Sequence, residues 1–200
     1  MKINLYKNKA YLIVFEGIDG SGKSTLSKLL KKFLENNNYD VVLLREPSNS
    51  KYGKKIREIA KNKSSIPIQE ELNYFIEDRK WNVKNNILPN LKKNKIVILD
   101  RYFFSTACYQ GARGLDMKEI LTINRNFAPE PDFVFVIDVD VKTALSRINN
   151  SREQTVKLFE KQEFLEKVRE NYLKLKGNNI YIINGKDSIE KVFKNILELL

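Results

Sequence analysis

The chain has 200 residues, of which 42% are hydrophobic, and its 36 Lys and Arg against 25 Asp and Glu give a net charge of +11. This size and composition predict one globular domain over residues 1–200, and no apolar run is long enough to cross a bilayer. The basic residues are scattered in short pairs, without an aromatic-interleaved stripe, so we expect neither a nucleic-acid nor a membrane partner. The apolar stretch Tyr11 to Phe15 is too short for a signal-peptide core, and the lone Cys108 cannot form an internal disulfide. Both features favour a cytoplasmic protein.

A glycine-rich segment, G-I-D-G-S-G-K-S, follows the apolar run Tyr11 to Phe15 and precedes a helical stretch beginning at Thr25. The spacing G-x-x-x-x-G-K-S in this setting predicts a phosphate-binding loop, in which backbone N–H groups and the helix dipole hold a phosphate. An ordinary glycine-rich turn is the alternative. Lys23 would reach the β- and γ-phosphates, and the Ser24 hydroxyl would bind Mg²⁺. We therefore expect a nucleoside triphosphate site formed by Gly17, Ile18, Asp19, Gly20, Ser21, Gly22, Lys23, Ser24 and Thr25.

Further short apolar runs alternate with helical stretches along the chain. With Tyr11 to Phe15 they give five predicted strands, the others being Val41 to Leu44, Ile96 to Leu99, Phe133 to Ile137 and Ile180 to Ile183. Apolar runs without alternation indicate strands buried on both faces, as in a parallel sheet between two helical layers. We predict an α/β fold, the three-layer sandwich of P-loop NTPases, with a small mobile lid. Ligands in such folds bind at the carboxyl ends of the strands.

Two residues follow the third predicted strand at this ligand-binding edge. Asp100 could complete the Mg²⁺ site that Ser24 begins, or it could cap a helix that starts at Tyr102 and Phe103. We favour the metal role because the phosphate-binding loop needs an acidic partner. Arg101 has the planar donor geometry for a bidentate grip on a phosphate.

The helical stretch Gln69 to Leu91 carries Phe75 and Arg79, which lie four residues apart and so on one helix face. Such a pair could stack on a base and hydrogen-bond its edge. Spacing alone favours a simpler explanation, core packing for Phe75 and a surface ion pair for Arg79.

The chain resembles the thymidylate kinases, a group of P-loop nucleoside monophosphate kinases. Four segments carry the resemblance in order: Phe15 to Thr25, Arg45-Glu46-Pro47, Phe75-x-x-Asp78-Arg79, and Asp100-Arg101-Tyr102-x-x-Ser105-Thr106-x-x-Tyr109-Gln110-Gly111. The last two are the family-specific ones, since many ATPases and GTPases share the loop alone. The resemblance implies transfer of the γ-phosphate of ATP to dTMP, giving dTDP and ADP, with Mg²⁺, in a homodimer.

The same resemblance implies a role for individual residues. Phe75 would stack on thymine, Arg79 would hydrogen-bond its edge, and Thr106 would lie near the base. Tyr109 would pack where a ribose 2′-hydroxyl would project, and Asp19 would approach the acceptor 3′-hydroxyl or the metal shell. The remaining acceptor contacts would come from Arg45, Pro47, Arg101 and Gln110, with Arg45 and Arg101 on the phosphate.

The sequence departs from the family pattern in two places. Relatives with Gly at the position of Gly20 usually take their catalytic cation from a lid arginine, but the matching segment here is Leu158-Phe159-Glu160. We predict a lid at about 147–160 and favour Arg152 as the cation, with Arg147 and Lys157 as alternatives. After Pro47, Ser48-Asn49-Ser50 stands where Gly-Gly-Thr is common, which puts the local turn and any contact of the last hydroxyl in question.

The absence of histidine excludes a histidine general base, and phosphoryl transfer to a monophosphate needs none, because the second pKa of a phosphate monoester is about 6. A kinase for UMP or dUMP is the nearest rival, since a pocket resolves one methyl by only about 1–3 kcal/mol. A GTP-dependent switch is a second rival, because Asn184-Gly185-Lys186-Asp187 nearly matches N-K-x-D, although a strand-end turn explains it equally well. The third rival is a DNA-stimulated ATPase.

Overall fold

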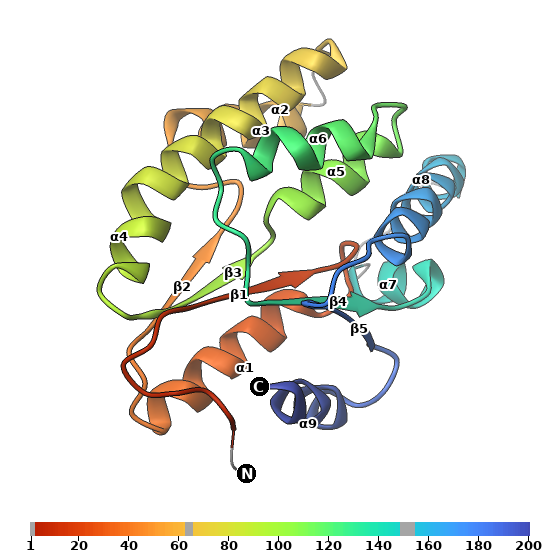
Figure 1. Ribbon diagram of the computed structural model, residues 1–200. Helices are drawn as coiled ribbons and strands as arrows, with labels where there is room; N and C mark the ends of the chain where they lie inside the picture. Colours follow the sequence, from red (N-terminus) through yellow and green to blue (C-terminus); the bar gives the residue numbers. More distant parts are fainter. Residues whose placement is uncertain (1–2, 63–65, 149–154) are drawn as a thin grey trace.

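Five parallel strands form the centre of the protein in the computed structural model, which describes residues 3–62, 66–148 and 155–200, the last range with side chains from 162 onward. The strands are β1 (Tyr11–Glu16), β2 (Val41–Arg45), β3 (Ile96–Asp100), β4 (Phe133–Asp138) and β5 (Ile180–Asn184). Their order in the sheet is β2-β3-β1-β4-β5 (Figure 1). The predicted five-stranded parallel α/β fold is confirmed.

Each strand extends one residue beyond its predicted end, and that residue is polar. In the sheet register, Asp100 of β3 lies beside Phe15 of β1 on one side and beside Arg45 of β2 on the other. Asp138 of β4 is likewise paired with Asn184 of β5. The polar residues therefore lie side by side at the carboxyl-terminal ends of the strands, which is where ligands bind in parallel sheets.

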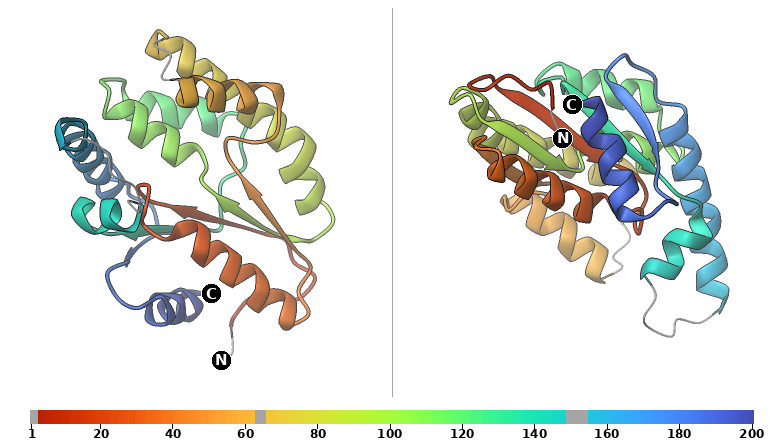
Figure 2. Two further views of the ribbon diagram at one scale, coloured as in Figure 1. Left: turned by 180° about the vertical axis from the view of Figure 1, so that it is seen from behind. Right: turned by 90° about the horizontal axis from the view of Figure 1, so that it is seen from below.

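The helices cover both faces of this sheet. α1 (Lys23–Asn36) and α9 (Ile189–Leu199) lie on one face, below the sheet in Figure 1, and most of the others lie above it. Figure 2 shows the same layers from behind and from below. The remaining elements are α2 (Lys51–Asn62), α3 (Ile68–Asn82), η1 (Val83–Ile87), α4 (Leu88–Leu91), α5 (Phe103–Gly111), α6 (Met117–Arg125), α7 (Val141–Ile148) and α8 (Thr155–Leu173).

The core is divided by the sheet, because successive strand residues point to opposite faces. In β1, Leu12 and Val14 pack toward α5 and α8, whereas Ile13 and Phe15 pack toward α1 and α9. All of β1 is buried. Two apolar faces on one strand explain why the sequence shows a continuous apolar run rather than alternation.

The predicted helix from Gln69 to Leu91 is interrupted by the π-helical turn η1 between α3 and α4. Pro89 has no N–H, so the α-helical bond to the carbonyl four residues earlier cannot form. Side-chain amides supply other bonds here: Asn85 donates to the Trp81 carbonyl at 2.8 Å and Asn90 to the Asn86 carbonyl at 2.7 Å. Among the described helices, none combines the length and apolar character needed to cross a membrane.

Candidate active site

The glycine-rich loop joins β1 to α1, and α1 begins at Lys23, two residues earlier than predicted. Gly22 precedes the helix with φ of 96° and offers no side chain to cap it, which suits an N-terminus that binds an anion. Gly20, with φ of 82°, packs so closely on α7 that an added Cβ would lie 2.2 Å from the Ala144 carbonyl oxygen. The loop therefore has the open, glycine-dependent form expected of a phosphate cradle.

Lys23 is 4% exposed and lies inside the loop. Its Nζ donates to the Ile18 carbonyl at 3.1 Å and lies 3.6 Å from Asp19 Oδ1. Burial, together with the nearby Arg101, lowers the pKa of Lys23 to about 8, against the opposing effect of Asp19, Asp100 and Glu16. An anionic ligand would add to the negative charge of these carboxylates, which alone do not offset the burial of the ammonium.

Ser24 and Asp100, the predicted metal pair, contact each other directly. The Ser24 hydroxyl donates to Asp100 Oδ2 at 2.5 Å, and Asp100 Oδ1 is buried without a hydrogen-bond partner in the described part of the chain. Arg45 Nε lies 3.8 Å from Asp100 Oδ2. The alternative in which Asp100 caps α5 is wrong, because the amides of Tyr102 and Ser105 donate to Glu16 instead. An unpartnered carboxylate oxygen beside a hydroxyl fits a divalent cation.

Arg101 joins the phosphate-binding loop to α5. Its Nη2 donates to Asp19 Oδ1 at 2.6 Å, its Nη1 donates to Ser105 Oγ at 2.9 Å, and its guanidinium lies 5.1 Å from the centre of the Tyr109 ring. The Asp19 amide donates to the Tyr109 hydroxyl at 3.2 Å. Arg101 has φ of 73°, a left-handed conformation that is costly for a residue other than glycine and typical of functional sites.

A cavity of about 540 Å³, here called the strand-end cavity, opens beside these residues. Asp19 and every predicted acceptor-binding residue line it, namely Arg45, Pro47, Phe75, Arg79, Arg101, Thr106, Tyr109 and Gln110. These residues come from four segments far apart in the sequence. The structure therefore brings together the whole set that the sequence predicted for the acceptor.

Arg79 is 1% exposed, so the interpretation of Arg79 as a surface ion pair is wrong. It forms a two-pronged ion pair with Glu46 Oε2, from Nε at 2.8 Å and from Nη2 at 2.6 Å. Nη1 donates to Asn124 Oδ1 at 2.7 Å, and Nη2 donates to Thr106 Oγ1 at 3.0 Å. Phe75 is half-buried and lines the cavity rather than lying wholly in the core. Spacing alone was misleading because the partners of Arg79 lie on other elements.

The unusual Ser48-Asn49-Ser50 turn is held by Asp78, the neighbour of Arg79 on α3. Asp78 accepts hydrogen bonds from the Ser48 amide at 2.7 Å, the Ser48 hydroxyl at 2.5 Å and the Ser50 hydroxyl at 2.6 Å. The Ser50 oxygen also accepts from the amides of Tyr52 and Gly53 in the first turn of α2. The last hydroxyl thus has a defined contact, and the turn fixes the segment that carries Arg45 and Pro47.

Several cavity residues were missed by the sequence reasoning. Glu46 was part of a quoted motif but received no role, although it is the buried counter-ion of Arg79. Arg57 of α2 lines the cavity and donates to the carbonyls of Pro47 and Ser48 at 2.9 and 2.8 Å. Phe164 of α8 also lines the cavity, with its ring centre 6.1 Å from that of Tyr109. For Arg57 and Phe164 no sequence signal points to a site role, because each lies in an ordinary helical stretch.

Of the candidate lid cations, Arg152 lies outside the described residues, as does the middle of the predicted lid. The same holds for the Lys157 side chain. Arg147, the third candidate, lies in the last turn of α7 and donates to the carbonyls of Gly185 at 3.1 Å and Ser21 at 3.4 Å. In Asn184-Gly185-Lys186-Asp187, the Asn184 side chain accepts from the Lys186 amide at 3.1 Å. That segment is therefore the strand-end turn that the sequence allowed.

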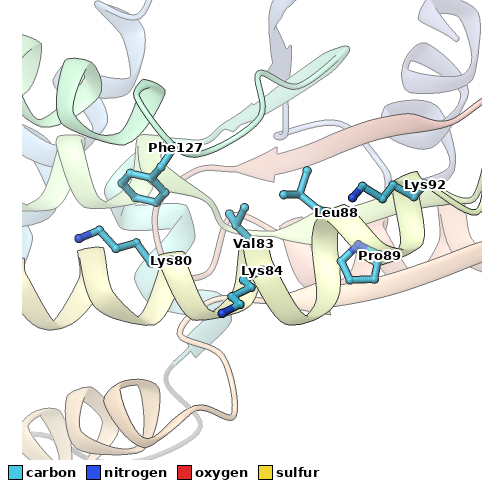
Figure 3. Close-up of a pocket in the computed structure, with 7 residues that line it drawn as sticks. All are labelled: Lys80, Val83, Lys84, Leu88, Pro89, Lys92 and Phe127. Carbon is cyan, nitrogen blue, oxygen red and sulfur yellow. The ribbon is translucent and has the colours of Figure 1, made fainter.

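A second hollow, here called the outer cavity, lies along α3, η1 and α4 and has a volume of about 470 Å³. Lys80, Lys84 and Lys92 surround an apolar floor that includes Val83, with Phe127 at one side (Figure 3). None of the sequence-predicted site residues lines it.

Comparison with known proteins gives a consistent answer. The thymidylate kinase family model matches residues 15–196. The chain is 42% identical over 190 residues to the thymidylate kinase of Desulfotalea psychrophila, covering 95% of this chain and 94% of that protein. It is 42% identical over 200 residues to the probable thymidylate kinase of Pyrococcus horikoshii, covering 96% of each. The crystal structure of the Ehrlichia chaffeensis thymidylate kinase superposes with a TM-score of 0.76 at 31% identity, over 96% of this chain and 98% of that one.

The matched region contains the phosphate-binding loop, the hydrogen-bonded Ser24–Asp100 pair and the whole strand-end cavity. The resemblance inferred from four motifs is therefore confirmed over nearly the full length, and the chain belongs to the thymidylate kinase family.

Proposed function

We propose that the strand-end cavity is the dTMP site of this enzyme and that the glycine-rich loop holds ATP. Members of the family phosphorylate dTMP to dTDP with ATP as the donor. The observation that supports the assignment is a direct contact between the loop and the cavity. Arg101 of the cavity donates from Nη2 to Asp19 Oδ1 of the loop at 2.6 Å. That contact would bring a donor phosphate in the loop and an acceptor phosphate on Arg101 into the proximity that in-line transfer requires.

The base would lie between Phe75 and the Arg79 network. Arginine can only donate hydrogen bonds. The guanidinium has five N–H groups, and the four contacts described, two to Glu46, one to Asn124 and one to Thr106, leave one N–H of Nη1 for a ligand. A donor at this place pairs with the 4-carbonyl of thymine or uracil and repels the 4-amino group of cytosine. The Thr106 hydroxyl, which accepts from Arg79 at 3.0 Å, can still donate.

The sugar and phosphate would lie toward Tyr109 and the arginines. The Tyr109 hydroxyl accepts from the Asp19 amide at 3.2 Å, and its ring would pack where a ribose 2′-hydroxyl would project. Arg101 and Arg45 would hold the acceptor phosphate, and the Asp19 carboxylate would approach the 3′-hydroxyl or the metal shell. Pro47 and Gln110 complete the wall.

Mg²⁺ is the cation that Ser24 and Asp100 would hold. No group of three or more acidic, cysteine or histidine side chains with metal-binding geometry occurs in the described part of the chain, so phosphate oxygens and water would complete the coordination. Bound there, the ion would neutralise charge on the transferred phosphate. The chain's own residues do the rest: Lys23 and Arg101 balance the phosphate charges, and the acceptor supplies its own nucleophilic oxygen.

Three finer assignments belong to the same proposal. Arg152 would provide the lid cation, with the lid at about 147–160. A homodimer would be the assembled state, as the family resemblance implies, and sedimentation or light scattering would test it. The cytoplasm would be the compartment, since the buried Cys108 is a free thiol.

The test is release of ADP from ATP and Mg²⁺ with dTMP, dUMP, UMP, dCMP, AMP or dGMP offered singly. We expect turnover to depend on dTMP, and Lys23→Ala to lose about 10³-fold because it removes a preorganised cation from the transferred phosphate. Turnover without any monophosphate would contradict the acceptor site and favour an ATPase or a nucleotide switch. Faster turnover with UMP than with dTMP would contradict the role given to Tyr109.

A further inference from the structure

Glu16, the last residue of β1, is a fully buried carboxylate that none of the roles above uses. Its Oε1 accepts from the amides of Tyr102 at 2.8 Å and Ser105 at 3.1 Å. Its Oε2 accepts from the Ser105 hydroxyl at 2.5 Å and the Tyr172 hydroxyl at 2.9 Å. Four donors converge on one side chain, and three of them lie at the start of α5.

These bonds replace a cap that α5 lacks. Tyr102, at the N-cap position, makes no side-chain capping bond. Glu16 instead accepts from the Tyr102 amide just before α5 and from the Ser105 amide in its first turn, which also donates to the Tyr102 carbonyl at 3.1 Å. The carboxylate that pairs them comes from β1, 86 and 89 residues earlier in the chain. A buried amide left unpaired is costly, so the start of α5 is tied to the position of Glu16.

Arg101 lies between these anchors. Its amide donates to the Phe15 carbonyl at 3.0 Å, and its Nη1 donates to the Ser105 oxygen that Glu16 holds. Its left-handed backbone needs support from its surroundings to persist. Phe15 accepts from the Arg101 amide and Glu16 holds the Ser105 hydroxyl, and these two residues directly precede Gly17, the first residue of the phosphate-binding loop.

We propose that Glu16 is a positioning residue that fixes Arg101, and with it the acceptor phosphate, relative to the phosphate-binding loop. Glu16 does not touch substrate, and it acts through the amide of Tyr102 and the hydroxyl of Ser105. The inference rests on the proposed role of Arg101 in the dTMP site. Tyr172 extends the same connection to α8, which also carries Phe164 at the cavity wall.

The experiment compares two ligands by titration calorimetry on the full chain: dTMP, which has the phosphate, and thymidine, which lacks it. For Glu16→Ala, we expect dTMP affinity to fall at least about tenfold, because Arg101 is no longer held in place to bind the phosphate. Thymidine affinity should change by less than about twofold, because thymidine has no phosphate. A merely structural residue would weaken both ligands alike. Equal losses, or no loss, would overturn the proposal.

Two further variants locate the effect. Glu16→Gln keeps an oxygen that can accept from the amides of Tyr102 and Ser105. We define the preference as the ratio of dTMP affinity to thymidine affinity, and this variant should regain more than half of the lost preference on a logarithmic scale. No recovery would contradict the hydrogen-bonding account. Ser105→Ala removes the hydroxyl that joins Glu16 and Tyr172 to the Arg101 side chain but leaves both amide bonds to Glu16, and it should lower the preference about threefold. If Glu16→Ala does not fold, this variant decides, and an unchanged preference would overturn the proposal.

The control is Asp132→Asn. Asp132 also bonds β1, accepting from the Leu12 amide at 2.8 Å, but it does not line the strand-end cavity. Both affinities should stay as in the wild-type protein, and a selective loss of dTMP affinity in this variant would count against the proposal. If the wild-type protein itself binds dTMP and thymidine alike, the role given to Arg101 is at fault and the proposal falls with it.

Discussion

The strand-end cavity and the outer cavity are similar in volume, about 540 and 470 Å³, and both are lined by cations and aromatic rings. They differ in how the cations are held. Arg79 is almost fully buried and bonded to Glu46, Asn124 and Thr106, whereas Lys84 of the outer cavity is exposed and Lys80 pairs with its helix neighbour Glu77 at 2.7 Å. A hollow in the surface is therefore poor evidence of a site, and buried charges with directed partners are better evidence.

The largest contrast is expected in stability. Glu46→Gln removes the charge that balances buried Arg79 and should cost about 3–5 kcal/mol of unfolding free energy. Glu130→Gln is the matched control, because Glu130 pairs with Arg125 at 2.6 Å with both side chains about half exposed. That change should cost no more than about 1 kcal/mol. Urea denaturation at pH 7 measures both, and similar costs would contradict the distinction between buried and solvated pairs.

The aromatic rings give the next contrast, in binding. Phe75→Ala should raise the KM for dTMP about 5- to 150-fold, the range expected when about 1–3 kcal/mol of base stacking is lost. Phe127→Ala removes the same side chain from the outer cavity and should leave this KM within about twofold. Steady-state kinetics on folded variants would decide. An equal effect of both changes would show that Phe75 acts through packing and not through the base.

Lys23 makes the burial of a cation measurable as a pH dependence. Because its pKa is lowered to about 8, the free protein has charged Lys23 below that pH and loses the charge above it. We expect kcat/KM for ATP to fall roughly tenfold per pH unit above about 8, while kcat, which reports the bound complex, stays level to higher pH. Lys23→Arg should lack this alkaline limb, because arginine stays charged. A limb that persists in that variant would assign it to another group.

The smallest effect should come from the outer cavity itself. Lys84→Ala removes an exposed ammonium that makes no contact with the predicted acceptor residues, and it should change kcat and the KM for dTMP by less than about twofold. A larger change would mean that the outer cavity contributes to turnover.

The fold and the loop could be predicted because their signals are local. Unbroken apolar runs marked the strands, and the loop motif lies within eight consecutive residues. Phe75 and Arg79 needed the family resemblance, since spacing on one helix does not reveal what faces it. The hydrogen-bond partners of Arg79 could not be predicted, because Glu46 is 33 residues away from it in the sequence and Asn124 is 45 residues away. Glu16 could not be given a role for the same reason, because its partners meet it only after the sheet has formed.

The contact between Gly20 and α7 also limits how this enzyme can change. A side chain at residue 20 would begin 2.2 Å from the Ala144 carbonyl oxygen, on a backbone with φ of 82° that side chains rarely adopt. An arginine cannot enter the loop there by one substitution, because α7 would have to move at the same time. A cation at residue 20 would therefore require a compensating change in α7. In evolutionary terms, this close approach couples residue 20 to α7, so the two positions would have to change together.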